Sequence, residues 1–108
     1  MTPREAGAEV AEYVLGLDAL GLGAKANGIR LRALLDVRAV LMRQSLLLGQ
    51  SLRLGRSVVP GAVSRSGLDE ARAEKLAREA SAMDAELVEV WGRCLEQLRI
   101  FYLTSEAA

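Results

Sequence analysis

Residue types that commonly carry out chemistry are scarce in this chain of 108 residues, which contains one Cys, at position 94, and no His. Without His the chain lacks the side chain that most often serves as a general base near neutral pH and as a metal ligand. One Cys forms neither an intrachain disulfide nor a cysteine zinc site. Because no nucleophile, base and orienting group can be assembled from the other residue types, we expect no enzyme, no metal site and no cofactor.

Two glycines, at positions 23 and 28, have the spacing of a phosphate-binding loop. In such a loop a Lys and a Ser or Thr follow the second glycine, where they hold phosphate oxygens and Mg²⁺. Ile29 and Arg30 occupy those positions here. We therefore interpret the segment from Gly21 to Gly28, which is rich in helix breakers, as a linker between two helices.

The carboxylates and the thiol also have structural interpretations. The dimetal pattern of helical bundles requires Glu-x-x-His on two helices, so Glu86 and Glu89 are interpreted as solvated outer-face residues. Cys94 belongs to an apolar stripe that recurs at steps of three and four residues. A Cys on such a stripe is typical of a small core residue rather than of a reactive thiol, which needs a basic and partly exposed setting.

Three helices are predicted to position these residues, over about 3–20, 29–56 and 67–103. Thr2 and Pro3 have the form of an N-cap and a first helical residue, Pro60-Gly61 suits the centre of a tight turn, and Ser66 starts a capping-box spacing. No strand candidate of useful length occurs. The expected fold class is all-α, a single helical domain over 1–108 in which a long antiparallel hairpin is accompanied by a shorter N-terminal helix.

The middle helix, 29–56, is apolar on more than one face. Its central stripe contains Leu34, Val37, Leu41, Leu48 and Leu52, and other apolar residues flank that stripe on both sides. A helix of this kind is buried on more than one face, which one neighbouring helix cannot achieve. We therefore expect a homo-oligomer, most simply a dimer that completes a bundle, with a closed or filamentous assembly left open. Ser45 and Gly49 are small residues that would let another helix approach closely.

Three of the four aromatic residues lie near the end of the last helix, at Trp91, Phe101 and Tyr102. They are interpreted as core residues that pack against the first helix, with a partner groove as the alternative. Gly92 costs about 1 kcal/mol in a helix relative to Ala, so close approach of another backbone is one reason for its presence. The hypothesised partner interface consists of Leu46, Leu47, Leu54, Trp91, Leu98, Phe101 and Tyr102.

Charge is distributed unevenly although the net charge is zero. Residues 1–23 carry one basic and four acidic side chains, 24–66 carry eight and one, and 67–108 carry five and nine. A basic middle helix between two acidic ones favours the expected pairing. The arginines also suggest a regulator that contacts nucleic acid, but they scatter around the helix, so nucleic acid is an unfavoured partner.

The function expected from these features is that of a non-enzymatic assembly, adaptor or chaperone-like protein that binds itself and possible hetero-protein partners through helical surfaces. The N-terminus lacks the apolar stretch of a signal peptide, and no run is long enough to cross a bilayer, so a cytoplasmic location is expected. As an alternative, Tyr102-Leu103-Thr104-Ser105-Glu106 is similar to the Y-x-x-x-D/E tail signal of the small helical substrates of type VII secretion. Those substrates usually place a W-x-G at the hairpin turn, whereas Trp91-Gly92 lies far from Pro60-Gly61.

Overall fold

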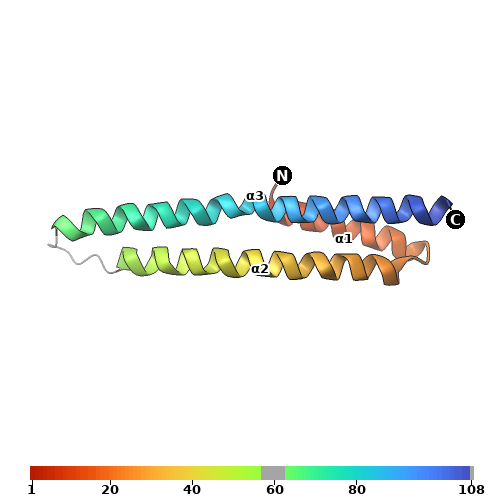
Figure 1. The fold of residues 1–108 in the computed structure, drawn as a ribbon, viewed down its shortest axis with the longest axis horizontal. Coiled ribbons are helices and arrows are strands. Elements are labelled where there is room, and N and C mark those ends of the chain that lie inside the picture. Colours follow the sequence, from red (N-terminus) through yellow and green to blue (C-terminus); the bar gives the residue numbers. More distant parts are fainter. Residues whose placement is uncertain (57–62, 108) are drawn as a thin grey trace. The chain divides into compact units, whose positions relative to one another are not determined.

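The protein folds into α-helices, as its sequence predicts. The structure, a computed structural model, describes the backbone of residues 1–56 and 63–107 and the side chains of 1–54 and 69–106. Its elements are α1 (Pro3–Ala19), α2 (Gly23–Arg56) and α3 (Val63–Ala107) (Figure 1). No strand occurs in the described residues. The turn expected at Pro60-Gly61 lies outside them.

Helix α1 begins and ends with hydrogen bonds that its sequence encodes. The backbone N–H of Glu5 donates to Thr2 Oγ1 at 3.2 Å, and Pro3 occupies the first turn, where its missing N–H is not needed. At the other end Gly21 has a φ of +79°, and its N–H donates to the carbonyl of Asp18 at 3.0 Å. The N–H of Leu22 reaches the carbonyl of Leu17 at 2.9 Å. This pair of bonds is a Schellman motif, which requires a residue such as Gly in the left-handed region.

Helix α2 begins at Gly23, so the linker predicted over residues 23–28 is wrong. The N–H of Ala26 donates to the carbonyl of Leu22 at 3.2 Å, which closes the first helical turn. The Asp18 carboxylate lies against Gly23, where a Cβ would clash with it, and a negative charge at a helix N-terminus is favourable. Ala26 is fully buried. Packing and this local charge therefore outweigh the turn preference of Asn27 and Gly28.

Helix α3 exceeds its predicted range at both ends. It begins at Val63 rather than near Gly67, because no Pro or Gly interrupts 62–66 and each added residue gains a backbone hydrogen bond. At its end the Thr104 hydroxyl donates to the carbonyl of Ile100 at 2.7 Å. The Tyr102 hydroxyl donates to Glu106 Oε1 at 2.6 Å. Both bonds join residues four apart, which lie on the same side of a helix that continues beyond 103.

The helices divide into two compact units. Met1–Ala39 and Asp84–Ala108 form one unit, which contains α1 and the adjoining parts of α2 and α3, and Val40–Met83 forms the other. We call them the three-helix unit and the two-helix unit. In Figure 1 the three helices of the first run alongside one another, and in the second α2 and α3 lie side by side.

The core of the three-helix unit is built from all three helices. Val10 of α1 and Leu98 of α3 are both fully buried. Trp91 packs against α1 at Gly7, where a Cβ would lie 3.3 Å from the indole ring. The other buried apolar side chains of this unit are Ala6, Val14, Leu17, Ala26, Ala33, Val37, Leu87, Val90, Cys94 and Leu95.

Two polar side chains of α2 face α3 in the two-helix unit. Gln44 Nε2 donates to the carbonyl of Ala80 at 2.9 Å, and the Ser51 hydroxyl donates to the carbonyl of Ala73 at 2.7 Å. Donors and acceptors are each seven residues apart, so the two bonds define one antiparallel register. Val40 and Ala80 are the buried apolar residues among the described side chains of this unit.

Candidate interaction surface

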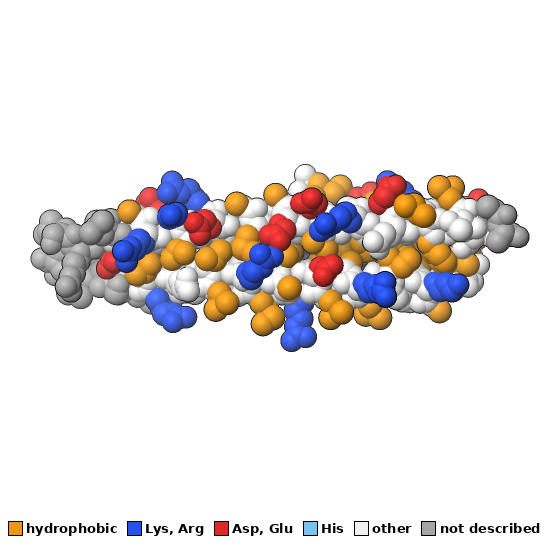
Figure 2. Space-filling view, viewed as in Figure 1, with side chains coloured by type: hydrophobic (Ala, Val, Ile, Leu, Met, Phe, Trp, Pro, Cys, Tyr) orange, Lys and Arg blue, Asp and Glu red, His pale blue; other side chains and the backbone are white. Residues whose placement is uncertain are grey.

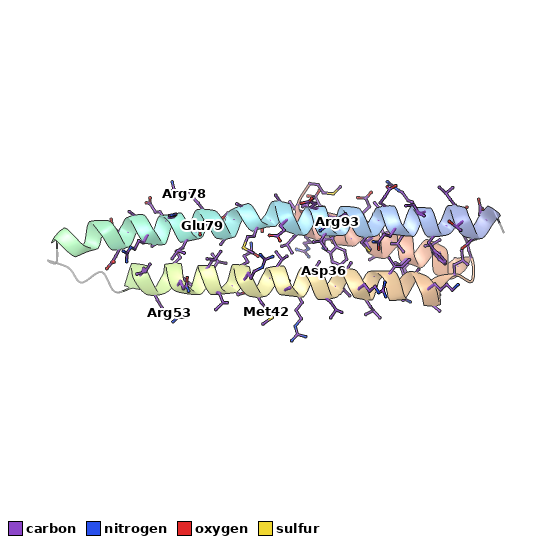
Figure 3. The ribbon with its side chains drawn as sticks, viewed as in Figure 1. Asp36, Met42, Arg53, Arg78, Glu79 and Arg93 are labelled. Atoms are coloured by element: carbon purple, nitrogen blue, oxygen red, sulfur yellow. The ribbon has the colours of Figure 1, made fainter. Side chains whose placement is uncertain are left out.

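The most apolar exposed surface of the two-helix unit lies on α2. The side chains of Met42, Leu46 and Leu52 are 59, 60 and 61 % exposed. Figure 3 shows Met42 on the side of α2 that points away from α3, and Figure 2 shows hydrophobic side chains projecting from that side. We call this surface the leucine face, and it consists of Leu41, Met42, Leu46, Leu48 and Leu52.

The centre of the leucine face contains small residues. At 100° per residue, Ser45 and Gly49 lie between Met42 and Leu46 on one side and Leu41, Leu48 and Leu52 on the other. A Cβ added at Gly49 would lie 3.9 Å from Arg53 Nη2, in ordinary van der Waals contact. Backbone along this line is therefore accessible to a second helix, because small side chains reduce the distance at which helices pack.

The outer side of α3 in the same unit is different. Its exposed residues include Glu74, Lys75 and Arg78, which are charged and readily hydrated. The uncovered apolar surface of the two-helix unit is thus concentrated on α2. Contiguous exposed apolar patches larger than a few hundred Å² are uncommon on monomers and mark interaction sites.

The seven residues of the hypothesised interface do not lie in one place. Leu46 is on the leucine face, while Leu47 and Leu54 are half-buried in the same unit. Trp91 and Leu98 are 8 and 0 % exposed, so they belong to the core of the three-helix unit. Their side chains are not available to a partner.

Phe101 and Tyr102, the remaining two, are half-buried and line separate open grooves of the three-helix unit. Phe101 contributes to a groove of about 400 Å³ beside Lys25 and Arg32 of α2. Tyr102 contributes to a larger groove of about 490 Å³ beside α1, which we call the acidic groove. Its lining residues are Glu9, Glu12, Tyr13, Gly16, Leu17, Leu20 and Tyr102.

Sequence reasoning missed the acidic groove, because the groove depends on which side of α1 packs against α3. A signal for it is nevertheless present, since Glu9, Glu12, Tyr13, Gly16 and Leu20 follow one another at helical spacing along one side of α1. Beside the groove, the hydrogen bond from Tyr102 to Glu106 and the negative charge of that carboxylate raise the pKa of the phenol.

Cys94 and the two glycines with the spacing of a phosphate-binding loop all lie within helices. Cys94 is buried, and burial raises the pKa of its thiol, an effect that Arg30 partly opposes. Gly23 and Gly28 are helical, so they form no phosphate-binding loop. Among the described residues no group of His, Cys, Asp and Glu could hold a metal ion. None of the helices, as far as they are described, combines the length and hydropathy of a membrane span.

Comparison of the chain with models of known protein families, with curated protein sequences and with solved structures finds no match. Function is therefore inferred from the surfaces of the molecule itself. Among these, the leucine face combines five large apolar side chains of one helix, each at least 43 % exposed.

Proposed function

We propose that the protein is a non-enzymatic assembly or adaptor protein that works by self-association. The leucine face on α2 is the observation that carries this proposal. Five large apolar side chains occupy twelve consecutive positions there, and each is at least 43 % exposed. Burial of apolar surface contributes about 25 cal/mol per Å², so burial of these five side chains against a partner favours association.

A second copy is the occupant that the composition of the two-helix unit favours. Val40 and Ala80 are the buried apolar residues among its described side chains, which is a small core for two helices of this length. Helices in bundles gain most of their stability from packing of an apolar face against neighbours. Further helices on the leucine face would supply that packing, and another copy of the same chain is always present at the same concentration.

The extent of the leucine face also suits an interface between protein chains. Stable interfaces bury roughly 1,200–2,000 Å² in total, about half of it from each partner. Five largely exposed Leu and Met side chains give several hundred Å² of apolar surface, which forms the centre of such an interface with a polar rim around it.

Substitution of Leu46 by Asp tests the proposal. A carboxylate at the centre of an apolar interface costs free energy because it loses its hydration, so self-association should weaken at least about tenfold. The measurement is mass by light scattering behind a sizing column at several concentrations, relative to the chain mass of 11.6 kDa.

Leu15→Asp is the matched control, because Leu15 is 69 % exposed against 60 % for Leu46 but lies on α1 in the three-helix unit. The control should associate as the unchanged chain does, and both variants should retain the helical circular dichroism of that chain. A mass of 11.6 kDa for the unchanged protein at every concentration would contradict self-association.

A further inference from the structure

The leucine face has a complementary surface on the same chain. We infer that the assembly is head-to-tail, so that the leucine face of one copy occupies the acidic groove of the next. This inference rests on the self-association proposed above. Both surfaces are described within single units, the face in the two-helix unit and the groove in the three-helix unit.

The shape and lining of the groove suit an apolar helix. Its volume of about 490 Å³ is open to solvent and can accept several aliphatic side chains. Tyr13, Leu17, Leu20 and Tyr102 give it apolar walls. Gly16 has no atom within 4 Å of the position that a Cβ would occupy, so the backbone of α1 is accessible there. An amphipathic helix laid in an apolar groove is a common mode of recognition between proteins.

The charges of the two surfaces are opposite. The groove is lined by Glu9 and Glu12, and no basic residue occurs among its described lining residues. Residues 40–56 of α2 include three arginines and no acid. One of them, Arg53, points away from α3 beside the leucine face (Figure 3). Glu106 adds a further carboxylate next to the groove through its hydrogen bond with Tyr102.

The two units also have opposite net charges. Residues 40–83 have seven basic and four acidic side chains, whereas 1–39 together with 84–108 have seven basic and ten acidic. Net charges of +3 and −3 attract one unit of a copy to the other unit of its neighbour. Complementary charge of this kind steers association and disfavours wrong pairings.

A symmetric contact between two leucine faces would lack this complementarity. It would bring together two copies of the two-helix unit, each with seven basic and four acidic side chains. Like charges placed opposite each other oppose association. The head-to-tail contact avoids this repulsion, and it leaves a vacant groove at one end and a vacant face at the other, so further copies can add.

Two variants blocked on opposite surfaces test the inference. Leu46→Asp/Leu52→Asp disables the leucine face and leaves the groove intact, and Glu9→Lys/Glu12→Lys reverses the charge of the groove and leaves the face intact. Each variant alone should remain at 11.6 kDa in light scattering. An equimolar mixture should form a species of twice that mass that does not grow with concentration, because each copy then has one competent surface.

The outcomes separate the inference from the proposed function. If the groove variant alone associates as strongly as the unchanged chain, or if the mixture stays at 11.6 kDa, the head-to-tail contact is wrong while self-association through the leucine face can stand. If the unchanged chain itself never exceeds that mass, both proposals fail.

A third variant tests the groove without any change of charge. Gly16→Leu fills the groove and should weaken association at least about tenfold, because the incoming side chains lose their place. Gly92→Leu is its control, since Gly92 is an exposed helical glycine of the same unit that also has open space around it. Equal association by both variants would overturn the inference.

Discussion

Gly7 and Gly92 are both helical glycines, yet their surroundings give them opposite effects on stability. Gly7 lies where α1 meets Trp91, and a Cβ there would be 3.3 Å from the ring. Gly92 has nothing within 4 Å, so the close approach that its sequence position suggested is not present in the described residues. The first glycine permits a contact between helices, and the second only lowers the intrinsic stability of α3.

Substitutions at these positions should therefore act in opposite directions. Gly92→Ala should raise the free energy of unfolding by about 1 kcal/mol through helix propensity. Gly7→Leu should lower it by about 1–3 kcal/mol, because a large side chain separates α1 from Trp91. Urea titration followed by circular dichroism measures both changes. A Gly92→Ala protein no more stable than the unchanged one would contradict the open environment of that position.

The ionisation of Cys94 predicts how stability depends on pH. Burial raises the pKa of its thiol above the ordinary value of 9.0, so the folded chain keeps the proton at a pH where the unfolded chain loses it. The free energy of unfolding should be insensitive to this group below pH 9 and should fall as the pH rises above it. Tyr102, with its pKa raised above 10.0, adds to the decline at higher pH. Urea titrations at increasing pH measure the slope, and Cys94→Ala should make that slope shallower.

At the level of elements, α2 buries or half-buries both polar and apolar side chains in the two-helix unit. Gln44 and Ser51 bond to α3 and Val40 is buried, while Met42 of the leucine face points away from α3. The central stripe predicted for this helix contains one buried residue, Val37, and the other four are exposed. Residue periodicity shows that α2 is apolar over a wide arc. It cannot show which part of the arc meets α3, because hydrogen bonds to the carbonyls of Ala73 and Ala80 make polar side chains acceptable there.

The bond between Ser51 and Ala73 should have a measurable effect on stability. Ser51→Ala removes one hydrogen bond, which contributes about 0.5–1.5 kcal/mol to folding. Ser45→Ala is the matched control, because it has the same change of helix propensity on the exposed side of the same helix. The difference between their free energies of unfolding should be about 1 kcal/mol, and equal values in urea titration would show that the Ser51 bond is not formed.

The sequence predicts helix type better than helix limits, and Ser66, predicted as the cap of the last helix, lies inside α3, which begins at Val63. The cap at Thr2 and the turn after α1 are confirmed by their hydrogen bonds. The start of α2 is not predicted, because the Asp18 carboxylate at Gly23 and the burial of Ala26 depend on tertiary contacts. The interface residues remain a hypothesis, and two of them, Trp91 and Leu98, are buried in the three-helix unit. Their periodicity identifies a buried stripe and cannot distinguish a core from an interface.

At the level of the whole molecule, buried residues are concentrated in the three-helix unit. Of the fifteen buried apolar residues among the described side chains, thirteen belong to it. The length of 108 residues predicts one domain. The concentration of buried residues follows from the 17-residue α1, all of which lies in the three-helix unit and contributes four of its buried residues.

Hydrogen exchange should reveal the difference between the buried cores of the two units. In the Leu46→Asp variant, amides of residues 41–54 should exchange faster than those of 87–98, because few buried apolar contacts oppose local opening in the two-helix unit. In the unchanged chain at high concentration, exchange over 41–52 should slow as the leucine face is covered. Mass spectrometry of peptic fragments measures both effects. Exchange at one uniform rate over both ranges would contradict the unequal cores.

The placement of the aromatic side chains determines what optical methods can detect. Trp91, the single Trp, is in the three-helix unit together with Tyr13, Phe101 and Tyr102, and residues 40–83 contain no aromatic residue. Tryptophan emission and near-ultraviolet dichroism therefore report on one unit alone, whereas far-ultraviolet dichroism records the helices of both. If the two-helix unit melts first, the far-ultraviolet signal falls while the emission of Trp91 stays constant, so the two units can be followed separately in a single unlabelled sample.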